Sequence, residues 1–360
     1  MKIKSLLVNN FMIFNNLNID LSPNINIISG ENSTGKTALI KLLYSNLKGY
    51  TEAYSSKGNT TRDDLEKAIV NKYQGVFRPD NESIGRLVNR KPGNNNADIL
   101  LTFSNNEEIK IGFSRKSSRH METLKGNLGD VGKLSPIYIP PKEIISTTVN
   151  FGALYDNYHI AFEETYYDLT RLLEKPLRKD SNTSEQNEVM ASFEKIVNGN
   201  IVQRDKKFYL KVRGAGEFEM GLVSEGYRKL TTIMYLILSG SLTKDSILFW
   251  DEPETNMNPK MIKPMVDALV TLANMGVQIF ITTHDYFVQQ CFNMEALYGK
   301  NKKLKYKFIS LYHSENSEIK VETADELGKI ENNAIMEEFD DLYDREQRIA
   351  LTLKLRKRLQ

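Results

Sequence analysis

The chain has 360 residues, with 48 Lys and Arg, 46 Asp and Glu, and four His, which gives a formal net charge of +2. With 26% charged and 40% hydrophobic residues, this composition excludes a disordered chain, a histone-like basic protein and an acidic tail. The single cysteine, Cys291, excludes an intramolecular disulfide framework and a cysteine-based zinc site, and it favours a reducing compartment. No segment reaches the ~18 apolar residues of a membrane span, and the N-terminus lacks the apolar region of a signal peptide. We therefore expect a cytoplasmic protein with no membrane contact.

Three short strands are predicted at the start of the chain, and the third leads into a glycine-rich loop at 30–35. The helix after this loop has apolar residues at helical spacing. Residues 49–96 are polar and predict a surface insertion with two short helices, and a hairpin, a basic loop and a strand ending at Pro140 follow. The ranges are Lys2–Val8, Leu17–Leu21, Asn24–Ser29, Lys36–Leu47, Asp63–Lys72, Glu82–Val88, Ile99–Phe103, Glu108–Phe113, Ser114–Lys133 and Pro136–Ile139.

The second half is predicted to begin with a helical region and a hairpin, and to continue with alternating helices and strands. Two of its strands are continuous apolar runs, which is typical of buried parallel strands. The last ~36 residues have a helical pattern. The ranges are Ala161–Leu173, Glu185–Val197, Phe208–Val212, Glu217–Met220, Gly226–Leu238, Ile247–Trp250, Lys260–Ala273, Val277–Thr282, Tyr306–Tyr312 and Glu318–Val321.

The loop after the third strand fits the pattern G-x-x-x-x-G-K-[ST] of a phosphate-binding loop. Its glycines let backbone N–H groups surround phosphates, Lys36 would reach the β- and γ-phosphates, and the Thr37 hydroxyl would bind Mg²⁺. The strand before it and the helix after it are the context that this chemistry requires. The candidate nucleotide-binding residues are Gly30, Asn32, Ser33, Thr34, Gly35, Lys36, Thr37 and Ala38.

Two further motifs follow apolar strands. Ile247–Trp250 delivers the adjacent carboxylates Asp251 and Glu252, which would hold Mg²⁺ and activate water. Alone, such a pair is more often an ordinary strand end, but a phosphate-binding loop needs an Asp elsewhere in the chain. The next buried strand ends at His284, which could contact a γ-phosphate.

A Ser-x-Gly turn at Ser224 and Gly226 opens the helix that precedes Asp251. A helix N-terminus with these residues is a phosphate-binding device, although Ser224 could equally be a plain N-cap.

The order of these motifs resembles the ATP-binding-cassette (ABC) ATPases, and specifically their RecF/SMC/OLD-like branch. Asp251-Glu252-Pro253-Glu254 followed by Pro259 looks like the branch's DEPE stretch. The opening with Phe11 and Phe14, and Tyr138-Ile139-Pro140-Pro141-Lys142-Glu143 at the Q-loop region, are also similar to it. The resemblance covers most of residues 1–312.

The resemblance implies an Mg²⁺-dependent ATP hydrolase. Lys36, Gly35 and Thr37 would bind phosphates and Mg²⁺, Asp251 would assist the metal, Glu252 would be the general base, and His284 would sense the γ-phosphate. Ser224 and Gly226 would contact ATP bound to a partner subunit, so the working unit would be a homodimer, or a higher homo-oligomer, joined through its heads.

Several residues depart from the family pattern. The signature motif, at residues 224–228, is Ser-Glu-Gly-Tyr-Arg. Asn258 stands where the family often has a His before Pro259. No Q-loop glutamine is evident, so either Lys142 or Glu143 would take that role.

The implied fold is α/β, an ABC-type ATPase head with a central mixed sheet, an antiparallel β subdomain and a helical lobe. We assign residues 1–48, 97–140 and 206–312 to the head, 49–96 to the polar insertion, 141–205 to the helical lobe and 313–360 to a C-terminal extension. Only ~76 residues follow His284, too few for the nuclease domain of full-length OLD proteins.

Two functions follow from this reading. The first is a sensor or regulatory ATPase of a bacterial antiphage defence system that controls a separate effector protein. The alternative is a RecF/SMC-like ATPase in DNA repair or maintenance, and a transporter ATPase is a weaker third option.

Two basic segments are candidate nucleic-acid contacts. One lies in the basic loop and the other ends the chain, where leucines interleave with the charges. For both we favour an ordinary solvated surface, with the terminal helix packed on the head. The residues are Lys110, Arg115, Lys116, Arg119 and Lys125, and then Lys354, Arg356, Lys357 and Arg358.

Overall fold

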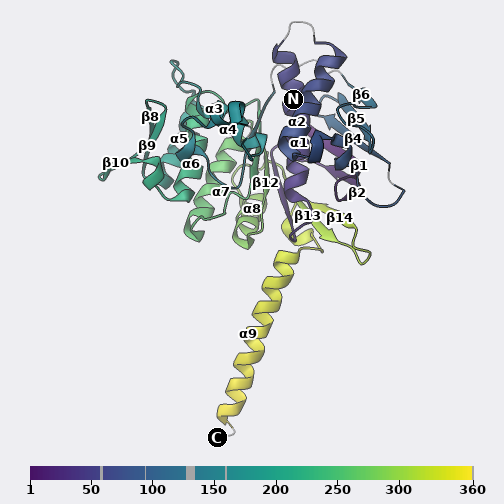
Figure 1. Ribbon diagram of the computed structural model, residues 1–360. Helices are drawn as coiled ribbons and strands as arrows, with labels where there is room; N and C mark the ends of the chain where they lie inside the picture. The colour runs from purple at the N-terminus through teal and green to yellow at the C-terminus, as the bar shows by residue number, and fades with distance from the viewer. Residues whose placement is uncertain (57–59, 94, 127–133, 159, 359–360) are drawn as a thin grey trace.

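The computed structural model describes residues 1–56, 60–93, 95–126, 134–158 and 160–358. Two packed halves lie on either side of a central sheet, and one long helix, α9 (Ala334–Arg358), extends away from them (Figure 1). The described residues form three sheets, of six, five and three strands. This arrangement confirms the predicted α/β class with a central mixed sheet.

The six-stranded sheet has the order β14-β13-β3-β12-β11-β7. Its strands are parallel except β14, which pairs antiparallel to β13. Every residue of β3, β11 and β12 is buried, because both faces of a parallel sheet are covered. The carboxyl ends of β3, β11 and β12 therefore meet at one edge of the sheet. The strands are β3 (Ile25–Gly30), β7 (Ser135–Ile139), β11 (Ser246–Asp251), β12 (Gln278–Thr282), β13 (Tyr306–His313) and β14 (Ile319–Ala324).

The five-stranded sheet is antiparallel, with the order β2-β1-β4-β5-β6. It shares one hydrophobic core with α1 and α2, which lie side by side. This half of the molecule carries the loop between β3 and α1. Its elements are β1 (Ile3–Phe11), β2 (Phe14–Asp20), β4 (Asn96–Phe103), β5 (Glu108–Ser114), β6 (Thr123–Lys125), α1 (Lys36–Ser56) and α2 (Arg62–Phe77).

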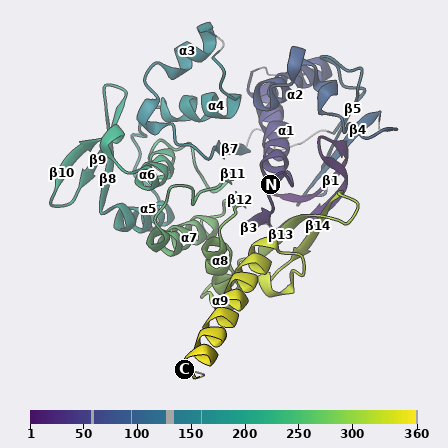
Figure 2. The same ribbon diagram turned by 60° about the horizontal axis from the view of Figure 1, so that its bottom comes forward.

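The other half is mainly helical and has a second core, with a three-stranded antiparallel sheet, β10-β9-β8, at its outer side (Figure 2). The predicted hairpin at 208–220 is present as β9 and β10, whereas β8 was not predicted. The elements are α3 (Phe151–Tyr158), α4 (Glu164–Leu173), α5 (Ser184–Val197), β8 (Gly199–Arg204), β9 (Lys207–Val212), β10 (Gly216–Glu219), α6 (Glu225–Leu238), α7 (Pro259–Asn274) and α8 (Tyr286–Tyr298).

The prediction of a polar surface insertion at 49–96 is wrong in one respect, because much of this segment is core. Tyr50, Ile69 and Tyr73 are fully buried among residues of β1, β4 and β5. Some of its polar side chains are exposed, such as those of Arg62 and Lys67 on α2, but others in the segment are buried. The helix predicted at Glu82–Val88 is instead made of two 3-10 turns, Asp80–Glu82 and Ile84–Leu87.

The predicted loop at Ser114–Lys133 contains a strand, β6, that pairs with β5. Residues 127–133 lie outside the described part of the chain. The helix predicted from Ala161 begins at Glu164. The assignment of ranges to head, insertion, lobe and extension stays a prediction.

The terminal helix does not pack along the head, contrary to the expectation. Its first turns are held by a hydrogen bond from Asn333 to Gln289 and by stacking of Phe339 on Tyr286, with ring centroids 4.2 Å apart. Every residue at 337–349 is exposed, and both views show the helix leaving the body (Figures 1 and 2). In the part of the chain that the structure describes, no helix combines the length and apolarity needed to cross a membrane.

Candidate functional site

The loop between β3 and α1 has the backbone that its two glycines permit. Gly30 has φ +145°, and a Cβ there would lie 2.1 Å from the carbonyl oxygen of Leu311 on β13. Gly35 has φ +94°, and a Cβ there would lie 2.6 Å from the ring of Phe14. Because L side chains rarely adopt these angles, both positions require glycine. The loop therefore lies tightly between β13 and the β1–β2 turn, and it opens at the N-terminus of α1.

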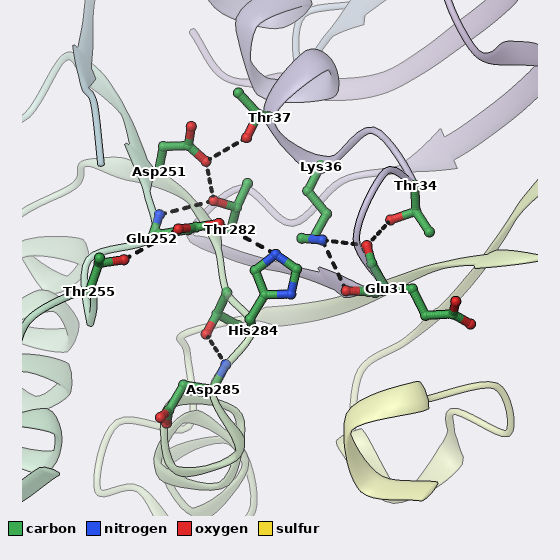
Figure 3. Close-up of polar contacts among 12 residues, drawn as sticks. Glu31, Thr34, Lys36, Thr37, Asp251, Glu252, Thr255, Thr282, His284 and Asp285 are labelled. Carbon is green, nitrogen blue, oxygen red and sulfur yellow. Dashed lines mark hydrogen bonds and ion pairs between the residues drawn. The ribbon is translucent and has the colours of Figure 1, made fainter. Parts of the chain in front are cut away.

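The amine of Lys36 is folded back onto this loop. Its Nζ donates to the carbonyl oxygens of Gly30 at 2.9 Å and Glu31 at 2.7 Å (Figure 3). Burial lowers the pKa of Lys36 to about 8, although the carboxylates of Glu252 and Asp251 oppose this shift. Of the other predicted loop residues, Thr34 closes the turn by donating to the Glu31 carbonyl, while Asn32 and Ser33 are exposed. Ala38 packs against the core.

Asp251 lies at the end of β11 and is fully buried. Its Oδ1 accepts hydrogen bonds from the hydroxyls of Thr37 (3.0 Å) and Thr282, and its Oδ2 accepts one from Tyr138 (3.0 Å). Burial raises the pKa of Asp251, and these three hydrogen bonds oppose the rise. Among the described residues, no Lys, Arg or His forms an ion pair with it. A buried carboxylate held only by hydroxyl groups is suited to a cation that binds beside it.

Glu252 follows at φ +47°, a left-handed conformation that is uncommon outside glycine and is found at functional sites. Its N–H donates to the carbonyl and hydroxyl oxygens of Thr282, which hold the strained backbone in place. The side chain lies 3.4 Å from Nε2 of His284 and accepts a hydrogen bond from Thr255 at 3.3 Å. The contact with His284 is the main cause that lowers the pKa of Glu252, so its carboxylate is ionised near neutral pH.

His284 is itself held by a neighbouring carboxylate. Glu254 accepts hydrogen bonds from the hydroxyl of Thr283 at 2.6 Å and from the backbone N–H of His284 at 3.1 Å. Glu254 is largely buried, and burial raises its pKa. The structure thus brings together Lys36, Thr37, Asp251, Glu252 and His284 at the edge where β3, β11 and β12 end (Figure 3).

Ser224 and Gly226 lie at the start of α6. Ser224 is the N-cap residue, is exposed, and makes no side-chain cap hydrogen bond. Within the described residues, no hydrogen bond joins Ser224 or Gly226 to the phosphate-binding loop. Instead, the Nζ of Lys229, one turn into α6, donates to the carbonyl oxygens of Glu252 (3.3 Å) and Thr255 (2.8 Å). The buried Lys229 therefore fixes α6 relative to the Asp251-Glu252 loop.

The segment after β7 also contacts α6. Glu143 forms an ion pair with Arg228 at 2.6 Å and accepts a hydrogen bond from the hydroxyl of Ser146. Of the two residues proposed for the Q-loop role, Glu143 is thus engaged with the signature helix. This pair joins the Q-loop region to the helix that opens at Ser224.

Sequence reasoning missed several residues of the site, namely Tyr138, Lys229, Thr255, Thr282 and Thr283. One signal was available for Thr282. In the parallel pair β11–β12, Asp251 aligns with Thr282, so a register drawn from the two apolar runs would have placed them together. Tyr138 was within a quoted motif and Lys229 within a predicted helix, but neither had an assigned role.

The basic residues at 110–125 are not one loop. Lys110 on β5 and Lys125 on β6 are opposite each other, while Arg115 donates to backbone carbonyls and Arg119 pairs with Glu82. Two of the five cations therefore have partners within the chain. Of the terminal basic residues, the structure describes only their place in α9.

The oxygen atoms of Thr37 and Asp251 are the hard ligands that Mg²⁺ prefers. Among the described residues no group of three or more His, Cys, Asp or Glu could hold a metal by itself. Mg²⁺ typically takes one or two carboxylates together with substrate phosphates and water, so this sparse donor set fits a metal that arrives with a nucleotide.

Comparison with known families agrees with this geometry. Residues 25–288, well over half of the chain, match the family described as "AAA domain, putative AbiEii toxin, Type IV TA system". The chain belongs to this family. It is an ABC-type P-loop ATPase of the RecF/SMC branch, as the order of its motifs predicted.

Relatives of this ATPase include DNA replication and repair protein RecF from two clostridia. That of Clostridium botulinum (strain Eklund 17B) is 28% identical over 111 residues, covering 31% of this chain and 27% of the relative. That of Clostridium acetobutylicum is 26% identical over 111 residues, with the same coverages. The match thus spans only about a quarter of the length of these relatives.

Solved SMC head domains have a similar fold. The SMC head bound to the C-terminal winged-helix domain of ScpA has a TM-score of 0.56 at 13% identity, covering 91% of this chain and 99% of that one. An SMC head with an extended coiled coil, bound to the C-terminal domain of ScpA from Pyrococcus furiosus, has a TM-score of 0.53 at 11% identity, covering 96% and 99%. These similarities confirm the ABC-type head.

Proposed function

We propose that this ATPase hydrolyses ATP at the site formed by Lys36, Thr37, Asp251, Glu252 and His284. The observation that carries the proposal is the buried Asp251, held by the Thr37 hydroxyl and placed next to an ionised Glu252. Mg²⁺ bound at Thr37 and Asp251 would neutralise charge on the phosphates. Lys36 would leave its two carbonyl acceptors and bind the β- and γ-phosphates through its ammonium group.

Glu252 would act as the general base. Its carboxylate would take the proton of the attacking water, whose oxygen would form the new bond to the γ-phosphorus as the bond to the β-phosphate oxygen breaks. Thr255 and His284 hold this carboxylate from two sides. The imidazole of His284 would then contact the transferred phosphoryl group.

Head engagement would complete the site. Ser224 is exposed at the N-terminus of α6, and in the described residues neither it nor the buried Gly226 has a hydrogen bond to the phosphate-binding loop of the same chain. A second copy would bring this helix N-terminus to the nucleotide. Lys229 links α6 to the loop of Glu252, and Arg228 links α6 to Glu143. Binding of α6 to the partner's nucleotide would therefore affect the position of the Glu252 carboxylate. ATP would thereby bias a two-state equilibrium between separate and engaged heads.

A charge at Ser224 tests this arrangement. We expect Ser224→Arg to abolish ATP-dependent dimerisation, because a large cation would replace the small side chain at the contact, whereas each single head should still bind ATP. The matched control is Ser181→Arg, at an exposed serine outside α6. Light scattering with and without a non-hydrolysable ATP analogue measures the mass. If Ser224→Arg still dimerised with ATP, the proposed contact would be wrong.

The low pKa of Lys36 predicts a pH dependence of nucleotide affinity. Its amine is half neutral at about pH 8 in the free protein, whereas bound phosphates would favour the charged form. Binding above pH 8 would thus take up a proton, and affinity would fall as pH rises, by at most about tenfold per pH unit. Titration calorimetry between neutral and alkaline pH measures this. A Lys36→Arg variant, which stays charged, should show a flat profile over this range. A flat profile for the unsubstituted chain would contradict the expectation.

For the biological role, we propose a regulatory switch in a bacterial antiphage defence system that acts on a separate effector protein. The matched family supports this proposal, because its description names a type IV toxin–antitoxin system, in which two components act together. Expression of the chain alone should then leave cells unharmed. Toxicity without any partner would contradict a separate effector.

The RecF relatives favour a second candidate, an ATPase of DNA repair or maintenance. This candidate predicts ATP-dependent binding to DNA gaps or DNA ends, and Lys36→Ala should abolish this binding. An electrophoretic mobility assay with and without ATP distinguishes the two candidates.

A further inference from the structure

The terminal helix α9 presents an apolar stripe to solvent. Leu342, Tyr343 and Ile349 are 61%, 57% and 62% exposed. With Phe339 and Ala350 they recur at intervals of three, four and seven residues, so they fall on one face of the helix. Glu346 is the one charged residue on this face at 339–350. A helix that leaves the body gains little from such a stripe unless another surface covers it.

The charges of α9 are divided between its two ends. Residues 337–344 contain five acidic and no basic side chains, whereas residues 345–358 contain six basic side chains and one acidic one. Two parallel copies would place like charges together along the whole length. Two antiparallel copies would place each acidic half opposite a basic half, which is favourable for paired helices.

We propose that α9 pairs with the α9 of a second copy of this chain, antiparallel, through the stripe of Leu342, Tyr343, Ile349 and Ala350. Phe339, at the base of this stripe, stacks on Tyr286 of its own chain. In a register centred on Glu346, Tyr343 lies opposite Ile349 of the second copy. An antiparallel pair of identical helices has two-fold symmetry, the commonest symmetry of homodimers.

This contact is separate from the engagement of heads. It requires neither nucleotide nor the residues of the ATP site, and it joins the two heads at opposite ends of a helix pair. A chain with both contacts would therefore form assemblies larger than a dimer in ATP. The failure of one contact leaves the other intact, so the two proposals are tested independently.

The experiment measures the mass of the full chain by light scattering at micromolar concentration, without nucleotide, in a Lys36→Ala background. We expect a dimer. Leu342→Glu with Ile349→Glu should raise the dimer dissociation constant at least about tenfold, because the seam would bury two new charges from each chain. The matched control is Leu351→Glu, which is 59% exposed but lies off the stripe and should stay dimeric. An unchanged melting temperature would show that all variants fold.

Disulfide trapping tests the orientation. In a Cys291→Ser background, a mixture of Tyr343→Cys and Ile349→Cys chains should form the mixed cross-link, and Tyr343→Cys alone should not. A cross-link between two Tyr343→Cys chains would show parallel helices and overturn the proposal. A monomeric chain, or a dimer that survives Leu342→Glu with Ile349→Glu, would also overturn it. So would a different protein that covers the stripe while the chain itself stays monomeric.

Discussion

Substituting Glu252→Gln is expected to lower ATP turnover by on the order of 10²–10⁴-fold, the usual contribution of a general base. Gln keeps the shape and can still accept a hydrogen bond from Thr255, but it cannot take a proton from water. Its amide would also lose the carboxylate contact with His284 that now lowers the pKa of Glu252. Phosphate release under saturating ATP measures the effect.

The same variant should still bind ATP, because Lys36, Thr37 and Asp251 are unchanged. Trapped in the bound state, it should favour engaged heads and show a larger dimer fraction in ATP than the unsubstituted chain. Glu219→Gln, at an exposed glutamate on β10, is the control and should hydrolyse ATP normally. If Glu252→Gln turned over ATP as fast as the unsubstituted chain, Glu252 would not be the general base.

The elements that carry the site could be predicted from sequence because each has a strong local pattern. The β-branched run before Gly30 and the apolar runs before Asp251 and His284 are buried parallel strands, whose side chains need not alternate. Since parallel strands end at one edge, the motifs that follow them must meet there. The structure confirms this meeting, with Thr37 bonded to Asp251 and Glu252 beside His284.

Residues that support the site from other elements could not be predicted in the same way. Tyr138 reaches Asp251 from β7, 113 residues earlier in the chain, and no local pattern indicates such a contact. Lys229 appeared to belong to a polar helix start, yet it is buried and bonded to two backbone carbonyls. A charged side chain is predicted to lie at the surface unless its buried partners are known.

The segment at 49–96 was misjudged for the same reason, and Lys72 is the clearest example. This lysine of α2 is buried and contacts Glu164 at 2.6 Å and Asp168 at 2.9 Å, both on α4. Glu52 of α1 lies 3.1 Å away, and Tyr44 of α1 donates to Asp168 at 2.7 Å. The two partners on α4 follow Lys72 by 92 and 96 residues, so no local sequence pattern indicates the charges that neutralise it.

Lys72→Met is expected to destabilise the protein by about 3–5 kcal/mol, because it leaves two carboxylates in a buried site without their cation. Burial alone would lower the pKa of Lys72, but Asp168, Glu164 and Glu52 outweigh it and raise the pKa. The ion pairs also join α1 and α2 to the helical half of the molecule through α4. Thermal unfolding monitored by circular dichroism measures the loss, with Lys67→Met, an exposed lysine of the same helix, as the control.

The pH dependence of this defect identifies its cause. Burial raises the pKa of Glu164 from 4.5 to about 7 even with Lys72 present, so the folded state favours the protonated acid. The stabilisation that Glu164 contributes is therefore complete below pH 4.5 and is lost as the pH rises through 7. Without Lys72 the pKa of Glu164 in the folded state should rise further. The loss of stability caused by Lys72→Met should therefore be smaller at pH 5 than at pH 8. Adding Glu164→Gln and Asp168→Asn to Lys72→Met should recover much of the loss at pH 8. A defect that is equal at both pH values and is not recovered would instead indicate lost packing of the lysine stem.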